Sequence, residues 1–239
     1  MRLVTLDFEG VKRRFVLFEY EGQGRSLRLV KDDRSRLLEG IASSEFFFDV
    51  ESGALAKVKR DKYRGRKRPL RWLFRDYFEK RLMFQFEARK EIRSQRAVRA
   101  AGLVTPRCVA WGLSFNPFNR RGSLLLMEHV QDVVTGEQHF ASLEVAGREA
   151  FLMRFCGDLM RLARAGYAHR DLHMNNLLCT PRGEIIWVDT HVRPLPRSKR
   201  GKWREVYRSI SNPRLLDEDW REWLHQEMKR RWKAEPQPR

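Results

Sequence analysis

One short segment, residues 168–191, constrains the fold more than any other part of the chain. Two apolar runs, residues 176–179 and 185–188, lie on either side of a turn-like stretch that contains proline and glycine. Short apolar runs bounded by turn residues are typical of β-strands, and a tight turn between two of them joins antiparallel neighbours. The segment therefore predicts a loop, a strand, a tight turn and a second strand that ends at an acidic residue.

Three polar residues flank this predicted hairpin. Asp171 closes the tripeptide His169-Arg170-Asp171, Asn176 follows it by five residues, and Asp189 follows the second apolar run. Strands of similar length return to their starting point, so we expect the three side chains at one end of the hairpin. An Asp at a strand end is by itself usually a cap or a turn residue, so the prediction depends on all three occurring together.

The combination is that of phosphoryl transfer. In kinases an Asp accepts the proton of the attacking hydroxyl, and an Asn and a second Asp hold Mg²⁺ beside it. The order and spacing predict Asp171 as the catalytic base and Asn176 and Asp189 as Mg²⁺ ligands, with ATP as the phosphoryl donor. We expect His169 and Arg170 to brace the loop without reacting.

Charge indicates the kind of partner. The chain has 239 residues, with 49 Lys and Arg against 31 Asp and Glu, and its formal net charge is +18. This length suits one domain or two small lobes. So one-sided a balance favours a polyanionic partner, which is a nucleic acid, an anionic membrane face or a phosphorylated glycolipid.

Three features bear on the compartment. The three cysteines, Cys108, Cys156 and Cys179, have neither disulfide-framework nor metal-ligand spacing, which favours a reducing environment. No apolar run approaches the roughly 20 residues that span a bilayer, and the first residues lack a signal-peptide core. We expect a cytoplasmic protein held by charge at the inner face of a membrane.

The first half of the chain predicts β-structure. Residues 1–30 contain short alternating runs, and residues 46–50 and 54–59 form a second hairpin pattern. In a kinase fold the strand after such a hairpin carries the lysine that binds the α- and β-phosphates. Lys57 and Lys59 lie on the same face of this strand because side chains alternate with period two, so either is a candidate.

A helix predicted from residue 84 to 101, ended by Gly102, carries the matching carboxylate. Glu87 and Glu91 lie on one face of it at i, i+4, and a kinase needs one of them to pair with the phosphate-binding lysine. No Gly-x-Gly-x-x-Gly motif occurs. Two segments are therefore candidates for the loop that covers the nucleotide phosphates: the segment at Gly40 and the turn at residues 51–53.

Residues 59–81 are densely basic with interleaved aromatic residues. Two interpretations have equal weight. The stretch is a solvated helix face with its aromatics in the core, or it is a surface that docks an anionic lipid or nucleic acid.

The remaining segments complete a two-lobed, protein-kinase-like α+β fold. An apolar strand at residues 122–130 leads into an interlobe hinge, where backbone groups from Glu128 to Val130 would meet the adenine edge. We therefore expect a β-rich N-lobe at residues 1–130 and a helical C-lobe at residues 131–239. Residues 143–165 predict a core helix. A helix near the end of the chain carries an apolar stripe, which we expect to pack within the lobe in preference to contacting a membrane. The stripe consists of Trp220, Trp223, Leu224, Met228 and Trp232.

Short motifs typical of one kinase family are spread from residue 34 to 227: Leu38-Glu39-Gly40, Phe48-Asp49-Val50, Ala56-Lys57 with Arg60, Glu91, the run from Ala101 to Thr105, Asn116-Pro117, Met127-Glu128, His169-Arg170-Asp171 and Val188-Asp189-Thr190-His191. In these motifs the chain resembles the lipopolysaccharide core kinases, the Kdo/heptose kinase family, and within it the inner-core heptose kinase branch. The resemblance favours Lys57 over Lys59 and Glu91 over Glu87. It implies an ATP- and Mg²⁺-dependent phosphotransferase acting on a sugar hydroxyl, heptose or Kdo, of the lipid A-core glycolipid.

The resemblance has departures that keep other functions open. The run Leu172-His173-Met174-Asn175-Asn176 is closer to small-molecule phosphotransferases of the aminoglycoside and choline kinase type, and Thr190 replaces a leucine that the family carries. The first alternative is therefore such a phosphotransferase. The second is a non-catalytic, basic nucleic-acid-binding protein on a kinase scaffold. Retention of all five expected site residues argues against the second, so we expect no obligate nucleic acid, and the oligomeric state stays open.

Overall fold

The structure, a computed structural model, describes residues 1–22, 24, 26–41, 44–60, 86–116 and 119–234. The chain divides into two compact units: the first comprises Met1–Ile92 and Pro106–His129, and the second comprises Arg93–Thr105 and Val130–Arg239. Most of the basic aromatic stretch at residues 59–81 lies outside the described residues. The division into lobes at residue 130 stays a prediction, and the two units differ from it because residues 93–105 group with the second unit.

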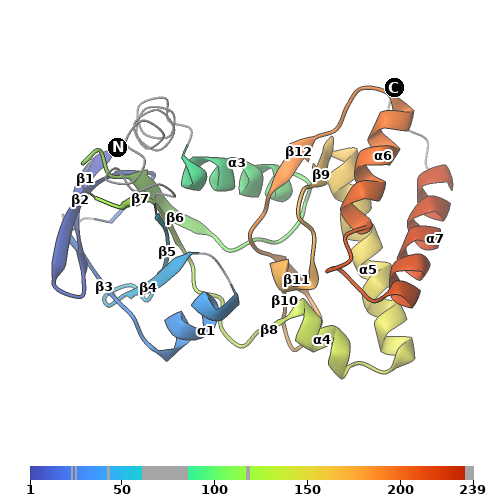
Figure 1. The fold of residues 1–239 in the computed structure, drawn as a ribbon, viewed down its shortest axis with the longest axis horizontal. Coiled ribbons are helices and arrows are strands. Elements are labelled where there is room, and N and C mark those ends of the chain that lie inside the picture. Colours follow the sequence, from blue (N-terminus) through green and yellow to red (C-terminus); the bar gives the residue numbers. More distant parts are fainter. Residues whose placement is uncertain (23, 25, 42–43, 61–85, 117–118, 235–239) are drawn as a thin grey trace, which may run out of the picture. The chain divides into compact units, whose positions relative to one another are not determined.

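The first unit is built on a closed barrel of seven strands (Figure 1). Around the barrel the order is β1-β2-β6-β7-β5-β4-β3. The strands are β1 (Arg2–Phe8), β2 (Val11–Phe18), β3 (Ser26–Val30), β4 (Glu45–Asp49), β5 (Leu55–Arg60), β6 (Cys108–Leu113) and β7 (Arg121–Met127). All neighbours are antiparallel except β1 and β3, which pair in parallel and close the barrel.

Alternation along the strands separates the barrel interior from its outer side. From Val4 onward, every second side chain of β1 is buried in the interior. The buried interior residues include Val4, Leu6, Phe8, Phe15, Leu17, Leu29, Phe47, Ala56, Val58 and Leu126. A second cluster lies on the outer side and includes Phe46, Leu55 and Leu125 with Phe86 and Ala88. The predicted strands at residues 1–30 and the hairpin at residues 46–59 are confirmed.

Among the described residues, two helices lie between barrel strands in the sequence. Helix α1 (Asp33–Ile41) lies in the connection between β3 and β4, and the Asp32 carboxylate accepts a hydrogen bond from the Ser35 backbone at 3.0 Å. Helix α3 (Glu87–Ala100) corresponds to the helix predicted from residue 84 to 101, and it ends just before Gly102, which adopts a positive φ of 77°. That left-handed conformation favours glycine, and it allows the Leu103 amide to bond back to the Val98 carbonyl at 3.2 Å.

The second unit is mainly helical and carries two small sheets. Its elements are β8 (Val134–Thr135), α4 (Gly136–Ser142), α5 (Val145–Arg164), β9 (Tyr167–His169), η2 (Met174–Asn176), β10 (Leu177–Cys179), β11 (Ile185–Trp187), β12 (Val192–Pro194), α6 (Lys199–Ile210) and α7 (Glu218–Ala234). The sheets have the strand orders β11-β10-β8 and β12-β9. The predicted core helix at residues 143–165 is α5.

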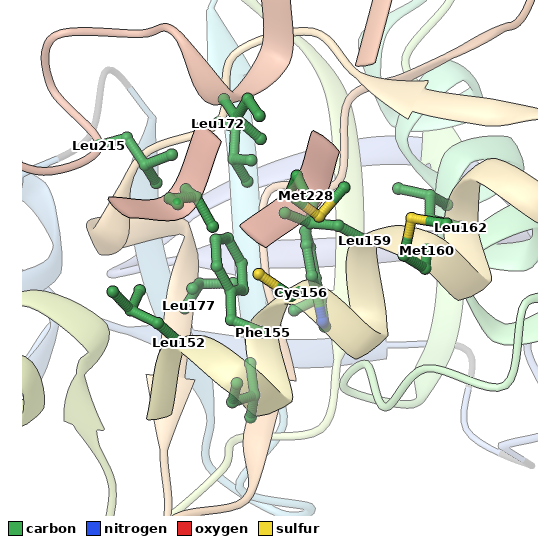
Figure 2. Close-up of a cluster of buried hydrophobic side chains, with 14 of the residues drawn as sticks. Leu152, Phe155, Cys156, Leu159, Met160, Leu162, Leu172, Leu177, Leu215 and Met228 are labelled. Atoms are coloured by element: carbon green, nitrogen blue, oxygen red, sulfur yellow. The ribbon is translucent and has the colours of Figure 1, made fainter. Parts of the chain in front are cut away.

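Helix α5 forms the centre of the second core. Its apolar stripe, which includes Leu152, Phe155 and Leu159, is buried against residues of the loop, the hairpin and α7 (Figure 2). Helices α5 and α7 pack side by side (yellow and red in Figure 1). The terminal apolar stripe packs here, because Leu224, Met228 and Trp232 are buried and the two tryptophans before them contact the same core. Packing, as predicted, is therefore its role. Within the described residues, no helix is both long and apolar enough to cross a membrane.

Candidate active site

The predicted hairpin is present. Strands β10 and β11 are antiparallel, and the Val188 amide donates to the Asn176 carbonyl at 2.9 Å, which extends the pairing by one residue beyond the strands. Asn176 is buried, and its side-chain Nδ2 donates to the Asp171 backbone carbonyl at 2.8 Å. Asp189 directly follows Val188. The hairpin therefore brings Asp171, Asn176 and Asp189 to one end, as the sequence predicts.

The donor atoms at this end suit a hard cation. Because Nδ2 of Asn176 is bonded to Asp171, its amide oxygen remains as the acceptor, and Asp189 adds a carboxylate. Asp189 has a positive φ of 48°, a conformation that non-glycine residues adopt mostly where surrounding structure holds them, as at functional sites. Mg²⁺ is commonly bound by one or two protein oxygens and completed by substrate phosphates and water. The absence of a cluster of three His, Cys, Asp or Glu among the described residues is compatible with this mode.

Backbone hydrogen bonds join His169 and Arg170 to neighbouring segments, and the stabilising role expected of the two residues stays a prediction. The His169 ring is buried, 5.9 Å between centroids from Trp187, and the Ser209 hydroxyl donates to its backbone carbonyl. The Arg170 amide donates to the His191 carbonyl at 2.7 Å. Burial lowers the pKa of His169 to about 4, so its ring is neutral at pH 7. Neither ring nitrogen has a hydrogen-bond partner within the part of the chain that the structure describes.

This neutral histidine makes the stability of the protein dependent on pH. The pKa of His169 is about 4 in the folded protein and near 6.5 in the unfolded chain, so protons bind preferentially to the unfolded chain between these values. The free energy of unfolding should fall by about 3 kcal/mol as pH decreases from 6.5 to 4. Urea denaturation at pH 7 and pH 4 measures this, and His169→Gln, which cannot titrate, should lose about 3 kcal/mol less. Equal losses in the two proteins would contradict the prediction.

Sequence reasoning missed one group of residues beside Asp171. The turn that follows α6 brings the side-chain Nδ2 of Asn212 to 3.4 Å from Oδ1 of Asp171. Arg214, in the same turn, contributes to lowering the pKa of His173, after the larger effect of burial. The dipeptide Asn212-Pro213 is a turn signal in the sequence, but nothing local says which residue such a turn will face.

The first unit holds the lysine and carboxylate. Nζ of Lys57 lies 2.8 Å from Oε1 of Glu91, and the two residues are only 7% and 3% exposed. Ala56 and Val58 point into the barrel, so Lys57 points outward on the side where α3 packs. The other carboxylate, Glu87, lies 3.7 Å from Lys90 on its own helix. Lys57 and Glu91, the two residues that the resemblance favours, are therefore the pair that forms.

Strand β7, which the predicted hinge follows, ends beside α1. The Glu128 amide donates to the Arg107 carbonyl at 2.8 Å. The next residue, His129, places its ring edge-on to Phe48 with 4.9 Å between centroids. The guanidinium of Arg34, in α1, lies 4.0 Å from the centre of the same Phe48 ring. Within the first unit, the start of α1 therefore lies next to the residues that follow β7. Val130, the other predicted adenine contact, begins the long segment of the second unit.

The predicted site residues form two sets, each inside one unit. Lys57, Glu91 and Glu128 belong to the first unit. The second unit contains Val130, Asp171, Asn176 and Asp189. A β-rich unit with a buried lysine–glutamate pair, and a helical unit with an Asp, an Asn and a second Asp on a hairpin loop, are the parts of a protein-kinase-like phosphotransferase.

Comparison with known proteins gives the family. The model of the lipopolysaccharide kinase (Kdo/WaaP) family matches residues 47–226. The chain belongs to this family, and it is an ATP-dependent phosphotransferase that acts on the lipopolysaccharide core. No curated protein sequence matches the chain significantly.

One solved structure supports the fold, and a second resembles the chain more weakly. A structure of WaaP in complex with acyl carrier protein superposes with a TM-score of 0.53 and 16% identity, and the match covers 92% of this chain and 90% of that one. The kinase domain of PknI from Mycobacterium tuberculosis gives a TM-score of 0.41 and 15% identity, covering 77% of this chain and 70% of that one. The α+β, protein-kinase-like fold predicted from the sequence is confirmed.

Proposed function

We propose that the protein transfers the γ-phosphoryl group of ATP to a heptose hydroxyl of the lipopolysaccharide inner core, with a Kdo hydroxyl as the alternative acceptor. The proposal is supported by the presence, in a member of the lipopolysaccharide kinase family, of all five residues that the sequence predicts for phosphoryl transfer. The set is Lys57, Glu91, Asp171, Asn176 and Asp189. A chain that had become a non-catalytic scaffold would have no need to retain all five.

Asp171 would orient the acceptor hydroxyl and accept its proton. Its side chain is exposed, while its backbone carbonyl is held by Asn176, so the loop is fixed and the carboxylate stays accessible. An exposed carboxylate on a fixed loop is suited to a substrate that arrives from solvent. Positioning and charge stabilisation supply most of the rate in this reaction class, and a general base adds to it.

Lys57 would bind the α- and β-phosphates, and Glu91 would hold its ammonium group in place. The burial of both side chains supports this role, because a charge this well shielded is kept only where it is paired. Backbone groups from Glu128 to Val130 would contact the adenine. Asn176 and Asp189 would hold Mg²⁺, which supplies positive charge against the phosphate oxygens.

The connection of β3 to β4 is the candidate for covering the nucleotide. In kinases the lysine-bearing strand is the third of the sheet, and the loop between the first two strands covers the phosphates. Here Lys57 lies on β5; β3 and β4 precede β5 along the chain, and the three strands are consecutive in the barrel. The segment at Gly40, which lies in α1, therefore has better support than the turn at residues 51–53.

Charge would hold the enzyme at the cytoplasmic face of an anionic membrane, where its glycolipid substrate also lies. The stretch at residues 59–81 remains a candidate for this contact. A second candidate is the exposed basic residues at the start of α6, among them Lys199 and Arg200. Neither has an ion pair within the described residues.

Vesicle binding tests the α6 contact. The double variant Lys199→Gln, Arg200→Gln should bind vesicles containing anionic lipid roughly 30-fold more weakly, because each cation near such a surface contributes about 1 kcal/mol. The control is Lys229→Gln, Lys233→Gln on α7, which removes the same charge from another exposed helix. Equal weakening by the two double variants would show that only net charge matters and that α6 is not the contact.

The function is tested with γ-labelled ATP, Mg²⁺ and core lipopolysaccharide stripped of its core phosphates. Wild-type protein should transfer label to the lipopolysaccharide, and mapping the labelled sugar distinguishes heptose from Kdo. Absence of transfer by a protein that binds ATP would overturn the proposal. Label in small hydroxylated acceptors instead would favour the aminoglycoside- or choline-kinase type, and salt-sensitive binding of nucleic acid without transfer would favour the non-catalytic alternative.

A further inference from the structure

The turn after α6 is held rigidly against the catalytic loop. The Leu215 amide donates to the Asn212 carbonyl at 2.9 Å, which closes the turn, and Leu215 itself is buried in the core of the second unit (Figure 2). On the other side, the Ser211 hydroxyl donates to the Tyr207 carbonyl at 2.7 Å. A turn tied to a helix end and to the core keeps its side chains in place.

The orientation of the Asn212 amide follows from its two neighbours. Its Oδ1 accepts a hydrogen bond from the Arg214 backbone amide at 3.0 Å. A backbone amide can only donate, so the amide oxygen must face Arg214. The Nδ2 group is then directed at Oδ1 of Asp171, 3.4 Å away. The contact is long for a hydrogen bond, as contacts in active sites without substrate often are before they shorten in the complex.

We infer that Asn212 is a positioning residue for the proposed catalytic base. By donating to Oδ1 of Asp171, Asn212 restricts rotation of an otherwise exposed carboxylate and leaves Oδ2 to face the acceptor hydroxyl. The inference rests on the proposed role of Asp171. In this arrangement the turn after α6 becomes part of the site, because it helps the catalytic loop to orient the Asp171 carboxylate.

Two substitutions separate this role from a structural one. Asn212→Asp keeps the oxygen that accepts from Arg214, so the turn is preserved, but it removes the donor and places a carboxylate beside Asp171. Asn212→Ala removes both contacts. If Asn212 orients Asp171, kcat should fall roughly 10-fold in Asn212→Ala and at least as far in Asn212→Asp, since misplacing a reacting group carries losses of this order or larger. KM for ATP should be unchanged in both.

Ser211→Ala is the matched control, because it removes the side-chain bonds of the adjacent residue without touching Asp171, and it should keep wild-type kcat. Wild-type kcat in Asn212→Asp, with or without a loss in Asn212→Ala, would overturn the inference, because a role confined to the turn survives the aspartate. A fall in kcat with KM for ATP raised in parallel would do so too.

Each variant is assayed both for transfer to dephosphorylated core lipopolysaccharide and for Mg²⁺-dependent ATP hydrolysis without an acceptor. Failure of wild type to label the lipopolysaccharide counts against the proposed acceptor alone. The hydrolysis rates of the Asn212 variants then still decide whether this residue positions Asp171, since water takes the place of the sugar hydroxyl.

Discussion

Replacement of Asp171 by alanine is expected to reduce the rate of phosphoryl transfer by roughly 10³-fold, within the range that a general base contributes. The fold should be unaffected, since the side chain is exposed and the hydrogen bond from Asn176 goes to the backbone carbonyl, which alanine retains. The rate is measured as transfer of label from γ-labelled ATP, and the melting temperature is measured beside it.

Asp219→Ala serves as the matched control for this substitution. Asp219 is an exposed aspartate in the first turn of α7, and it lies outside both sets of site residues. It should transfer phosphoryl at the wild-type rate. If Asp171→Ala kept more than about a tenth of wild-type kcat, the loss would be much smaller than a general base contributes. The assignment of Asp171 as base would then be wrong.

The second large effect is expected at the buried pair of the first unit. Lys57→Met should abolish productive ATP binding and should also destabilise the protein by about 3–5 kcal/mol, because it leaves the Glu91 carboxylate buried without its partner. Stability is measured by urea denaturation, and activity by phosphoryl transfer. Lys59→Met, on the same face of the same strand, is the control and should remain active.

A double variant distinguishes the two effects of Lys57. Lys57→Met combined with Glu91→Leu replaces both buried charges by apolar groups, a change that is often neutral or stabilising. We expect it to recover most of the lost stability while remaining inactive. Recovery of phosphoryl transfer along with stability would contradict the phosphate-binding role of Lys57 and leave the pair with a purely structural one.

Local pattern was sufficient for much of this protein. The hairpin that carries Asn176 and Asp189 follows from two short apolar runs around a proline- and glycine-containing turn, and both runs form strands. The core helix α5 follows from apolar residues at helical spacing. These features depend on interactions between residues close in sequence, and a period of 2 or 3.6 reports them directly.

Local sequence patterns did not predict which distant segments pair with each other. Nothing in the alternation of β1 indicates that it pairs in parallel with β3 and closes a barrel, because the same alternation suits an open sheet. The sequence likewise gave no sign that the turn at Asn212 would face Asp171. These contacts join residues brought together only by packing.

The site shows the division most clearly. The sequence by itself determined which residue types were available and placed Lys57 with Lys59 on one face of a strand, and Glu87 with Glu91 on one face of a helix. Periodicity cannot choose within either pair, because both members have the same phase. Only the tertiary structure, by packing α3 against the outer side of the barrel, buries Lys57 against Glu91 and leaves Glu87 beside Lys90. Two buried charges are stable in that position only as a pair. The packing of α3 against the barrel therefore also selects which lysine and which glutamate form the pair.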